Sequence, residues 1–258
     1  MKRTHILIAA MTGCLALPLA GCTSTESKQA VAAVPELNLT APLPAIAATY
    51  ITTRRQIAHA ANKNTDHGEH DHKKQEAAAV EWRFYREQNR VEVEDLKSDT
   101  GELWLRDSNT QFFFKLFHAD RRGIEYRMDD LQILQVTASW QQHALLIDPG
   151  VLQKLTLIEA GWRDGYPYRR LHGENKGERI EVTWRIDLNL PQEIKRSDAE
   201  HSETTRLQAV FPLAQSPWQR RDHGDYEMID YADLGDRESD PFVIRVQSQL
   251  PGGDVHHH

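Results

Sequence analysis

The sequence predicts a mainly β (α+β) fold: an antiparallel meander with a helical insertion. Over residues 80–128, short stretches of alternating apolar and polar side chains are separated by turn sequences rich in Asp, Asn, Ser and Gly. This pattern is typical of consecutive antiparallel strands. Residues 180–190 resume the alternation, so the sheet has one apolar face and one wet face.

Five short strands are expected first, at residues 80–85, 91–94, 102–105, 111–118 and 124–128. In the fourth, Phe112, Phe113 and Phe114 break the alternation, so both faces of the sheet are apolar there. Either a helix covers the second face or that face lines a pocket for an apolar ligand. Packing in the core is the interpretation that we favour, because buried aromatic side chains most often belong to a core.

Two helices are expected after the fifth strand. Asp129 or Asp130 can cap the first, whose apolar positions recur at helical spacing as far as residue 145. Asp148 followed by Pro149 is a second helix start, since Asp is a favoured N-cap residue and Pro fits the first helical position. Gly161 is expected to end that second helix.

The sheet is expected to resume near residue 166 and to turn at residues 174–177. The eleven residues 180–190 then alternate without exception, which predicts one strand of roughly 36 Å at about 3.3 Å per residue. Further strands are expected at residues 206–213 and 226–231. A short helix is expected to start at Asp240, which is followed by Pro241.

Aromatic residues divide the chain, because Tyr50 is the only one of them between residues 22 and 79. Aromatic side chains dominate core burial. The sequence therefore predicts a signal peptide (1–21), a tether (22–79), a β-rich globular domain (80–250) and a flexible His-ending tail (251–258). Within the tether, Ile46, Tyr50 and Ile57 lie at loose helical spacing, which predicts a helix over residues 45–63.

The N-terminus has the features of a lipoprotein signal. Two cations at residues 2 and 3 precede a mostly apolar stretch that is too short to span a bilayer and is typical of a secretory signal. Residues 19–22, Leu-Ala-Gly-Cys, resemble the lipobox of bacterial lipoproteins. The resemblance implies cleavage before Cys22, a thioether-linked diacylglycerol on its sulfur, and acylation of the freed amine. Thr23 in place of Asp implies the outer membrane, with the protein facing the periplasm.

The charge balance of the mature chain bears on its partners. Cleavage would leave 237 of the 258 residues, with 29 Lys and Arg against 38 Asp and Glu, a formal net charge of −9. This excess of acid argues against a nucleic-acid partner, which requires clustered basic residues. The membrane is instead expected to be contacted through the lipid anchor. Cys22 would be the last cysteine left, so the core must hold the fold without a disulfide.

A lipobox, a tether and a long antiparallel meander with a helical insertion resemble the LolA/LolB-like superfamily of lipoprotein carriers and receptors. The resemblance rests on the charge-rich hairpins at 80–128, the strand 177–191 that ends in Leu-Pro, and the return strand 206–213. It implies that the meander forms an open, incomplete β-barrel with the helical insertion as a lid. The barrel would surround an apolar cavity that binds an acyl chain or a lipidated protein. Val182, Trp184 and Ile186 would then contact the ligand, at about 0.8 kcal/mol per buried CH₂.

A second function is suggested by a histidine-rich run in the tether. His67, His70 and His72 lie within seven residues that also hold three carboxylates. Imidazole is a ligand for Zn²⁺, Cu²⁺ and Ni²⁺, so a metal-handling lipoprotein is the alternative function. A solvated polar run is the simpler interpretation of such a composition. The acidic stretch 233–240 is expected to be a surface loop, and the histidines at 256–258 support no functional inference.

The chain lacks the sequence signatures of common catalytic sites: it contains no G-x-S-x-G, H-E-x-x-H, P-loop or G-x-G-x-x-G pattern. The histidines outside the tether are scattered along the chain. We therefore expect a non-catalytic protein without a required cofactor. A structural or assembly lipoprotein that binds no ligand is a third possibility that the sequence leaves open.

The lipid anchor gives the first testable prediction. Cys22→Ser should accumulate as unprocessed precursor, because the thioether bond requires sulfur. Radiolabelled palmitate should label the wild-type protein and not the variant. Equal labelling of the two, or a mature N-terminus at another residue, would contradict the predicted anchor.

Overall fold

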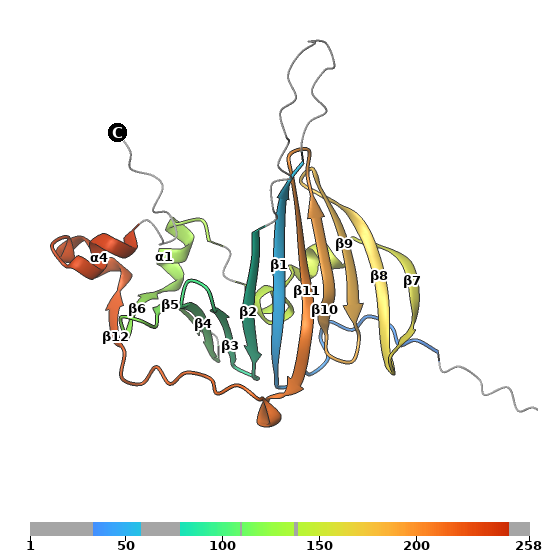
Figure 1. The fold of residues 1–258 in the computed structure, drawn as a ribbon, viewed down its shortest axis with the longest axis horizontal. Helices are drawn as coiled ribbons and strands as arrows, with labels where there is room; N and C mark the ends of the chain where they lie inside the picture. The colour runs from blue at the N-terminus through green and yellow to red at the C-terminus, as the bar shows by residue number, and fades with distance from the viewer. Residues whose placement is uncertain (1–32, 58–77, 109, 137–138, 248–258) are drawn as a thin grey trace, which may run out of the picture. The chain divides into compact units, whose positions relative to one another are not determined.

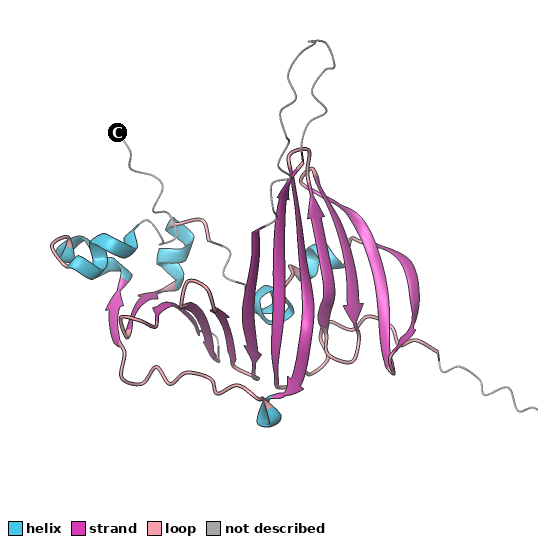
Figure 2. Ribbon diagram, in the orientation of Figure 1, coloured by secondary structure: helices cyan, strands magenta, loops and turns pink. Residues whose placement is uncertain are grey.

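The computed structural model describes residues 33–57, 78–108, 110–136 and 139–247, and its compact unit begins at Val34. These residues form one large sheet with a few short helices (Figures 1 and 2). The strands are β1 (Ile46–Gln56), β2 (Ala78–Arg86), β3 (Arg90–Asp95), β4 (Thr100–Asp107), β5 (Thr110–Phe117), β6 (Arg122–Tyr126), β7 (Thr156–Arg163), β8 (Tyr166–Asn175), β9 (Glu178–Arg185), β10 (Leu190–Ser197), β11 (His201–Pro212) and β12 (Glu227–Asp230). The α-helices are α1 (Met128–Ile133), α2 (Trp140–Leu145), α3 (Pro149–Leu152) and α4 (Pro241–Val246).

The twelve strands follow the order β12-β6-β5-β4-β3-β2-β1-β11-β10-β9-β8-β7. Neighbouring strands are antiparallel, except that β12 runs parallel to β6. The order ends at two edges, β12 and β7, so the sheet is not closed into a barrel. The predicted mainly β, open antiparallel architecture is therefore confirmed. No helix in the described ranges is long and apolar enough to cross a membrane.

The five strands expected between residues 80 and 128 are confirmed as β2 to β6. Their turns contain residues with positive φ, namely Asp99, Ser108 and Arg121 at 54°, 50° and 52°. Such turns join neighbouring antiparallel strands, so alternation and turn composition together were sufficient to locate this half of the sheet.

The helix expected over residues 45–63 is wrong, because residues Ile46–Gln56 form strand β1. β1 lies between β2 and β11 and pairs with both along its length. Its alternate residues Ile46, Ala48 and Tyr50 are buried in the core, and this spacing fits a strand as well as a loose helix. The globular domain consequently begins near Val34 and not at residue 80. The signal peptide and the histidine-rich run lie outside the described residues.

The helical region differs from the prediction in length. The first expected helix is split into α1 and α2, and Arg127 rather than Asp129 or Asp130 occupies the N-cap position of α1. Asp148 does cap α3, accepting the Gly150 N–H at 2.7 Å, but this helix ends at Leu152. Residues expected to continue it form β7 instead, because they pair with β8.

The single long strand expected at residues 180–190 is two strands. β9 ends at Arg185 and β10 begins at Leu190, with a hairpin turn between them in which Asn189 has a φ of 47°. The apolar–polar alternation continues through this turn, so periodicity gave no sign of it. The remaining expected strands and the terminal helix are confirmed as β11, β12 and α4.

We call the side of the sheet that packs against the helices the inner face. On β1 to β6 it bears a core cluster that includes Tyr50, Phe84, Trp104 and Phe113, which packs against α1, α2 and α4. On β8 to β10 it bears a second cluster centred on Trp184, which packs against α3. Helix α2 contributes to both, through Ala144 in the first and Leu145 in the second.

Arg86 connects the segments around these clusters. This arginine is fully buried at the end of β2. Its guanidinium donates hydrogen bonds to four backbone carbonyls: Pro44 (3.3 Å), Ala144 (2.8 Å), Leu188 (2.6 Å) and Asn189 (3.2 Å). These belong to the segment before β1, to α2 and to the β9–β10 turn. Burial lowers the pKa of Arg86 to about 10, which leaves the side chain cationic at neutral pH.

Replacing this side chain should destabilise the fold strongly. Arg86→Met should lower the free energy of unfolding by about 3 kcal/mol or more, because four buried carbonyls lose a donor. Arg86→Lys should cost less, since an ammonium can satisfy some of them. Urea unfolding measures both variants against the exposed control Arg54→Met. A loss below about 1 kcal/mol for Arg86→Met would contradict this role.

Candidate functional site

A pocket of about 430 Å³ lies on the inner face between two parts of the sheet that are distant in strand order. One wall comes from β3 and β4, where Val91, Val93 and Trp104 project toward it. The opposite wall comes from β8 to β10 and includes Ile180 and Arg196. The antiparallel register places these residues on one face, since Val91 pairs with Trp104 and Arg196 pairs with Ile180.

The third side of this inner-face pocket is helical. Leu146 and Ile147 join α2 to α3, and Leu146 has a φ of 60°, a left-handed C-cap that reverses the chain there. His143 of α2 stacks on Trp104, with ring centroids 3.7 Å apart and an angle of 18°. Val151 of α3 completes the apolar lining. Seven of the fourteen lining residues are apolar, and the other seven are polar or charged, among them Glu102, Asp148 and Arg196, so the pocket is open and of mixed polarity.

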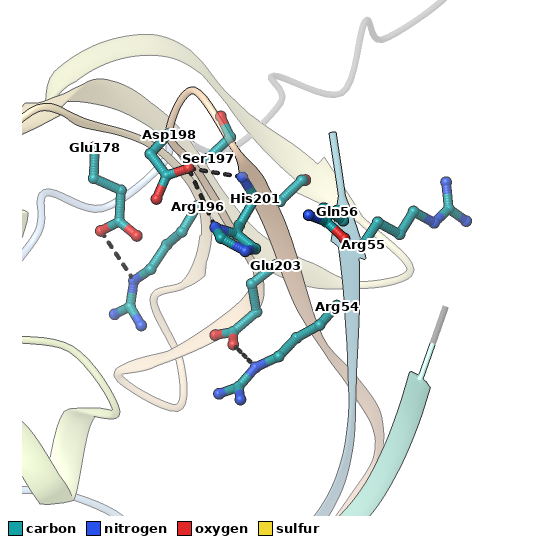
Figure 3. Close-up of a pocket in the computed structure, with 10 residues that line it drawn as sticks. Arg54, Arg55, Gln56, Glu178, Arg196, Ser197, Asp198, His201 and Glu203 are labelled. Atoms are coloured by element: carbon teal, nitrogen blue, oxygen red, sulfur yellow. Dashed lines mark hydrogen bonds and ion pairs between the residues drawn. The ribbon is translucent and has the colours of Figure 1, made fainter. Parts of the chain in front are cut away.

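A second, larger pocket of about 630 Å³ continues from the first at the end of strands β1 and β9 to β11 (Figure 3). The two pockets share Glu178 and Arg196. Arg196, Glu203 and Arg54 occupy paired positions on β10, β11 and β1, forming a row of alternating charge. Arg54 Nε lies 2.5 Å from Glu203 Oε2, and Arg196 Nε lies 4.0 Å from Glu178 Oε2.

The turn between β10 and β11 forms the rim of this charged pocket. Asp198 accepts the backbone N–H groups of Glu200 and His201 at 2.7 Å each, and these bonds lower the pKa of its carboxyl. The His201 ring lies 3.8 Å from the same carboxyl. Arg55 points away from the other side chains in Figure 3, as expected for the residue after Arg54 in a strand.

Polarity therefore changes along the inner face. Beyond the charged row, the Thr52 and Thr205 hydroxyls are hydrogen-bonded at 2.9 Å. Beyond them, Tyr50 stacks on Trp82 with centroids 4.7 Å apart. Between Arg54 and Tyr50, four residues apart on β1, the inner face passes from charged through hydroxyl to aromatic side chains.

The structure places the predicted ligand-contact residues in the core, outside the lining of both pockets. Val182 and Trp184 are fully buried in the core cluster of β8 to β10, and Ile186 packs against that cluster. The Trp184 ring N–H faces Asn189 Oδ1 at 3.4 Å. Neither of the two pockets described above is lined by these three residues; Ile180, on the same face of β9, lines the inner-face pocket.

Sequence reasoning missed most of the pocket lining. Val91, Val93 and Trp104 were expected in strands, but no pattern indicates that β3 and β4 face β9 and β10. The loop between α2 and α3 falls between the two expected helices, and no motif indicates that it lines a pocket. A signal was present only in the apolar pair Leu146 and Ile147, which immediately precedes the Asp-Pro helix start.

The other predicted site residues lie outside the described part of the chain: Cys22, and His67, His70 and His72. Metal binding by those histidines stays a prediction. Among the described residues, no group of three or more His, Cys, Asp or Glu side chains could hold a metal ion. Asp240 has the expected capping role, accepting the Phe242 N–H at 2.8 Å. It also pairs with Arg122 at 2.7 Å, which helps lower its pKa to about 2.

A polar cluster on the opposite, outer face involves the segment 216–226. Glu92 is fully buried there, 2.7 Å from Arg90 and 3.3 Å from His223 Nε2, and burial raises its pKa. His118 Nδ1 lies 3.2 Å from the Tyr226 hydroxyl, and its ring lies 5.6 Å from that of His223. Burial lowers the pKa of both histidines to about 4, so both are neutral at pH 7. This cluster fastens the segment to the sheet.

Comparison with known proteins gives no family. No family model matches the chain, and no curated protein matches it significantly in sequence. Among solved structures, PNGF-II in two crystal forms is 13% and 11% identical, with TM-scores of 0.34 and 0.36, covering 75% and 74% of this chain. MucB in complex with MucA(peri) is 10% identical, with a TM-score of 0.33, covering 72% of this chain.

The chain spans 33% and 32% of the length of the PNGF-II chains and 56% of MucB. TM-scores below 0.5 at such identities assign neither a fold family nor a function. The resemblance to lipoprotein carriers therefore still depends on the sequence features alone.

The two outer-face histidines should make stability depend on pH. The unfolded chain takes up their protons near pH 6.5, whereas the folded protein does so only near pH 4. The free energy of unfolding should therefore fall as the pH is lowered through this interval, by up to about 3 kcal/mol per histidine. Glu92, with its raised pKa, acts in the opposite direction. The nearby cations Arg90 and Arg221 disfavour protonation of the rings.

His118→Gln combined with His223→Gln should remove most of this loss. Urea unfolding at pH 7 and pH 4.5 measures the difference for each protein, so any cost of the substitutions at pH 7 cancels. The exposed His201→Gln is the matched control. An unchanged pH dependence in the double variant would contradict the assignment.

Proposed function

We propose that the protein binds the acyl chain of a lipid, or of a lipidated partner, non-covalently in the inner-face pocket. The observation that carries the proposal is that two pockets share Glu178 and Arg196: one of about 430 Å³, where Val91, Val93, Trp104, Leu146, Ile147, Val151 and Ile180 form an apolar half of the lining, and a charged one. A volume of this size lies within the range of small-molecule sites. Each methylene buried there contributes about 0.8 kcal/mol.

The acyl chain of the ligand would lie among Val93, Trp104 and Ile180, and the polar end of the ligand would lie at Arg196. The Arg196 side chain is 4.0 Å from its carboxylate partner Glu178, which is longer than a charge-assisted hydrogen bond of about 2.8 Å. Its guanidinium therefore has donors left for an acidic group on the ligand. No bond in the ligand is made or broken in this proposal.

The place of action is part of the proposal and rests on the sequence. Acylation at Cys22 would hold the protein at a membrane of the cell envelope, facing the periplasm. There it could receive an acyl chain from a lipid or a lipoprotein. A role without a ligand, in which the protein only holds a partner in an assembly, is the alternative that the binding experiment tests.

Titration of a fluorescent fatty acid into the mature protein, without detergent, tests whether the pocket binds an acyl chain. Saturable binding is expected, weakened roughly tenfold or more when two methylenes are removed from the probe. Val93→Trp, which fills the pocket from the β3 wall, should weaken binding about tenfold or more. Ile133→Trp, at a side chain that is 78% exposed, should bind as the wild type does. No saturable binding would overturn the proposal.

A variant at the junction of the two pockets tests the orientation of the ligand. Arg196→Gln should weaken binding of the fatty-acid probe about five- to tenfold, because a charge-assisted hydrogen bond is lost. It should leave binding of the corresponding fatty alcohol unchanged, since that probe carries no charge. Equal weakening for both probes would show that Arg196 acts on the shape of the pocket and not on the head group.

A further inference from the structure

The edge strand β7 carries an unusual share of exposed apolar surface. Seven large hydrophobic side chains are exposed in the described residues, and three of them lie on β7. These are Leu157 (46% exposed), Ile158 (44%) and Trp162 (41%). Single exposed apolar residues are normal, but three within six residues on a sheet edge indicate a surface that contacts something.

The pairing of β7 with β8 gives these three side chains different surroundings. Leu157 pairs with Leu171 and Trp162 pairs with Pro167, while an irregularity between Leu157 and Glu159 leaves Ile158 without a partner on β8. Cations accompany them: the Arg170 side chain is 47% exposed, and the Arg163 guanidinium lies 4.7 Å from the Tyr168 ring centroid. Glu159 of β7 is 45% exposed and forms an ion pair with Arg170 at 3.6 Å, so among the described residues Arg163 is the cation of this edge that lacks a carboxylate partner. Aliphatic, tryptophan and arginine side chains are typical of residues at a membrane interface.

The chain that leads to the predicted lipid anchor reaches the sheet at this same edge. Arg169 of β8, which pairs with Ala160 of β7, donates to the Pro35 carbonyl at 3.0 Å and forms an ion pair with Glu36 at 2.7 Å. Cys22 lies twelve residues before Val34. Twelve residues span at most roughly 40 Å, so a bilayer that holds acylated Cys22 lies within that reach of the point where the chain meets the β7–β8 edge.

We infer that the β7 edge rests on the bilayer in which Cys22 is anchored, with Leu157, Ile158 and Trp162 in the interfacial layer. Tryptophan prefers this layer because its ring is apolar and its N–H is polar. The unpaired backbone groups of the edge stay at the depth of the hydrated head groups, because hydrocarbon would leave them without partners. The inference is independent of the acyl-binding pocket and uses the predicted anchor to place the membrane.

The mature chain can be anchored for the experiment through its own residue. Cys22 is the one cysteine in residues 22–258, so it can be coupled to a maleimide lipid in phosphatidylcholine–phosphatidylglycerol vesicles that contain brominated phosphatidylcholine. Bromine quenches tryptophan fluorescence at short range. The difference between wild type and Trp162→Phe isolates the signal of Trp162, which should be quenched in brominated vesicles and not in unbrominated ones.

Two double variants make the test specific. Leu157→Ser with Ile158→Ser should abolish the quenching of Trp162. Ile133→Ser with Ile244→Ser, at positions 78% and 60% exposed, should leave it unchanged. All four side chains are exposed, so unaltered thermal unfolding is expected for both variants. Absence of Trp162-dependent quenching in the wild type would overturn the inference.

A second copy of the chain is the competing occupant of the edge. If light scattering shows a dimer of the uncoupled protein that Leu157→Ser with Ile158→Ser converts to a monomer, the edge is an interface between copies and the inference is wrong. If the wild type and the double variant are both monomers, and Trp162 of the wild type is quenched on vesicles, the membrane inference is supported. The fatty-acid titration contains no vesicles. A negative quenching result therefore leaves the acyl-binding proposal standing, and a negative titration leaves the membrane inference standing.

Discussion

A buried guanidinium with carbonyl partners holds together the elements that surround the inner-face pocket. Arg86 lies on β2, yet its four hydrogen bonds reach the segment before β1, helix α2 and the β9–β10 turn. One partner, the Ala144 carbonyl, belongs to the last turn of α2, where the partial negative charge of a helix is concentrated. Carbonyl dipoles thus compensate a charge that burial makes costly. Because α2 and the β9–β10 hairpin each contribute to the lining of the pocket, its shape depends on this one side chain.

The pocket itself follows from how the sheet curves. Val91 and Ile180 lie on strands that are five places apart in the sheet, yet they line one space, because α2 and α3 fill the region between the two halves of the inner face. Apolar side chains on a sheet normally meet a second layer that covers them completely. Here the covering helices are six and four residues long. Short helices cover only part of an apolar face, and the uncovered remainder is the pocket.

Local pattern was sufficient where strands are joined by tight turns. β2 to β6 could be placed from alternation and turn residues, and Asp148 and Asp240 could be identified as helix caps. Sequence pattern failed where pairing between distant segments decides the secondary structure. Ile46, Ala48 and Tyr50 fit two periodicities, and only the flanking strands make them β. The helix expected from Asp148 to Gly161 gives way to β7 from Thr156 onward, because pairing with β8 overrides the helical pattern there. The binding pocket joins distant strands, so its lining residues could not be assembled from sequence neighbours.

The pairing of β1 with β11 has a consequence for how the protein folds. Ile46 pairs with Pro212 and Gln56 with His201, so the central ladder of the sheet joins residues near opposite ends of the chain. Closing so large a loop costs entropy before any contact is gained, and folding rates fall as the sequence separation of contacts rises. The hairpins from β2 to β6 can form locally, but β1 keeps one open side until residue 212 is available. Folding of this sheet should therefore be slow and limited by its central strand.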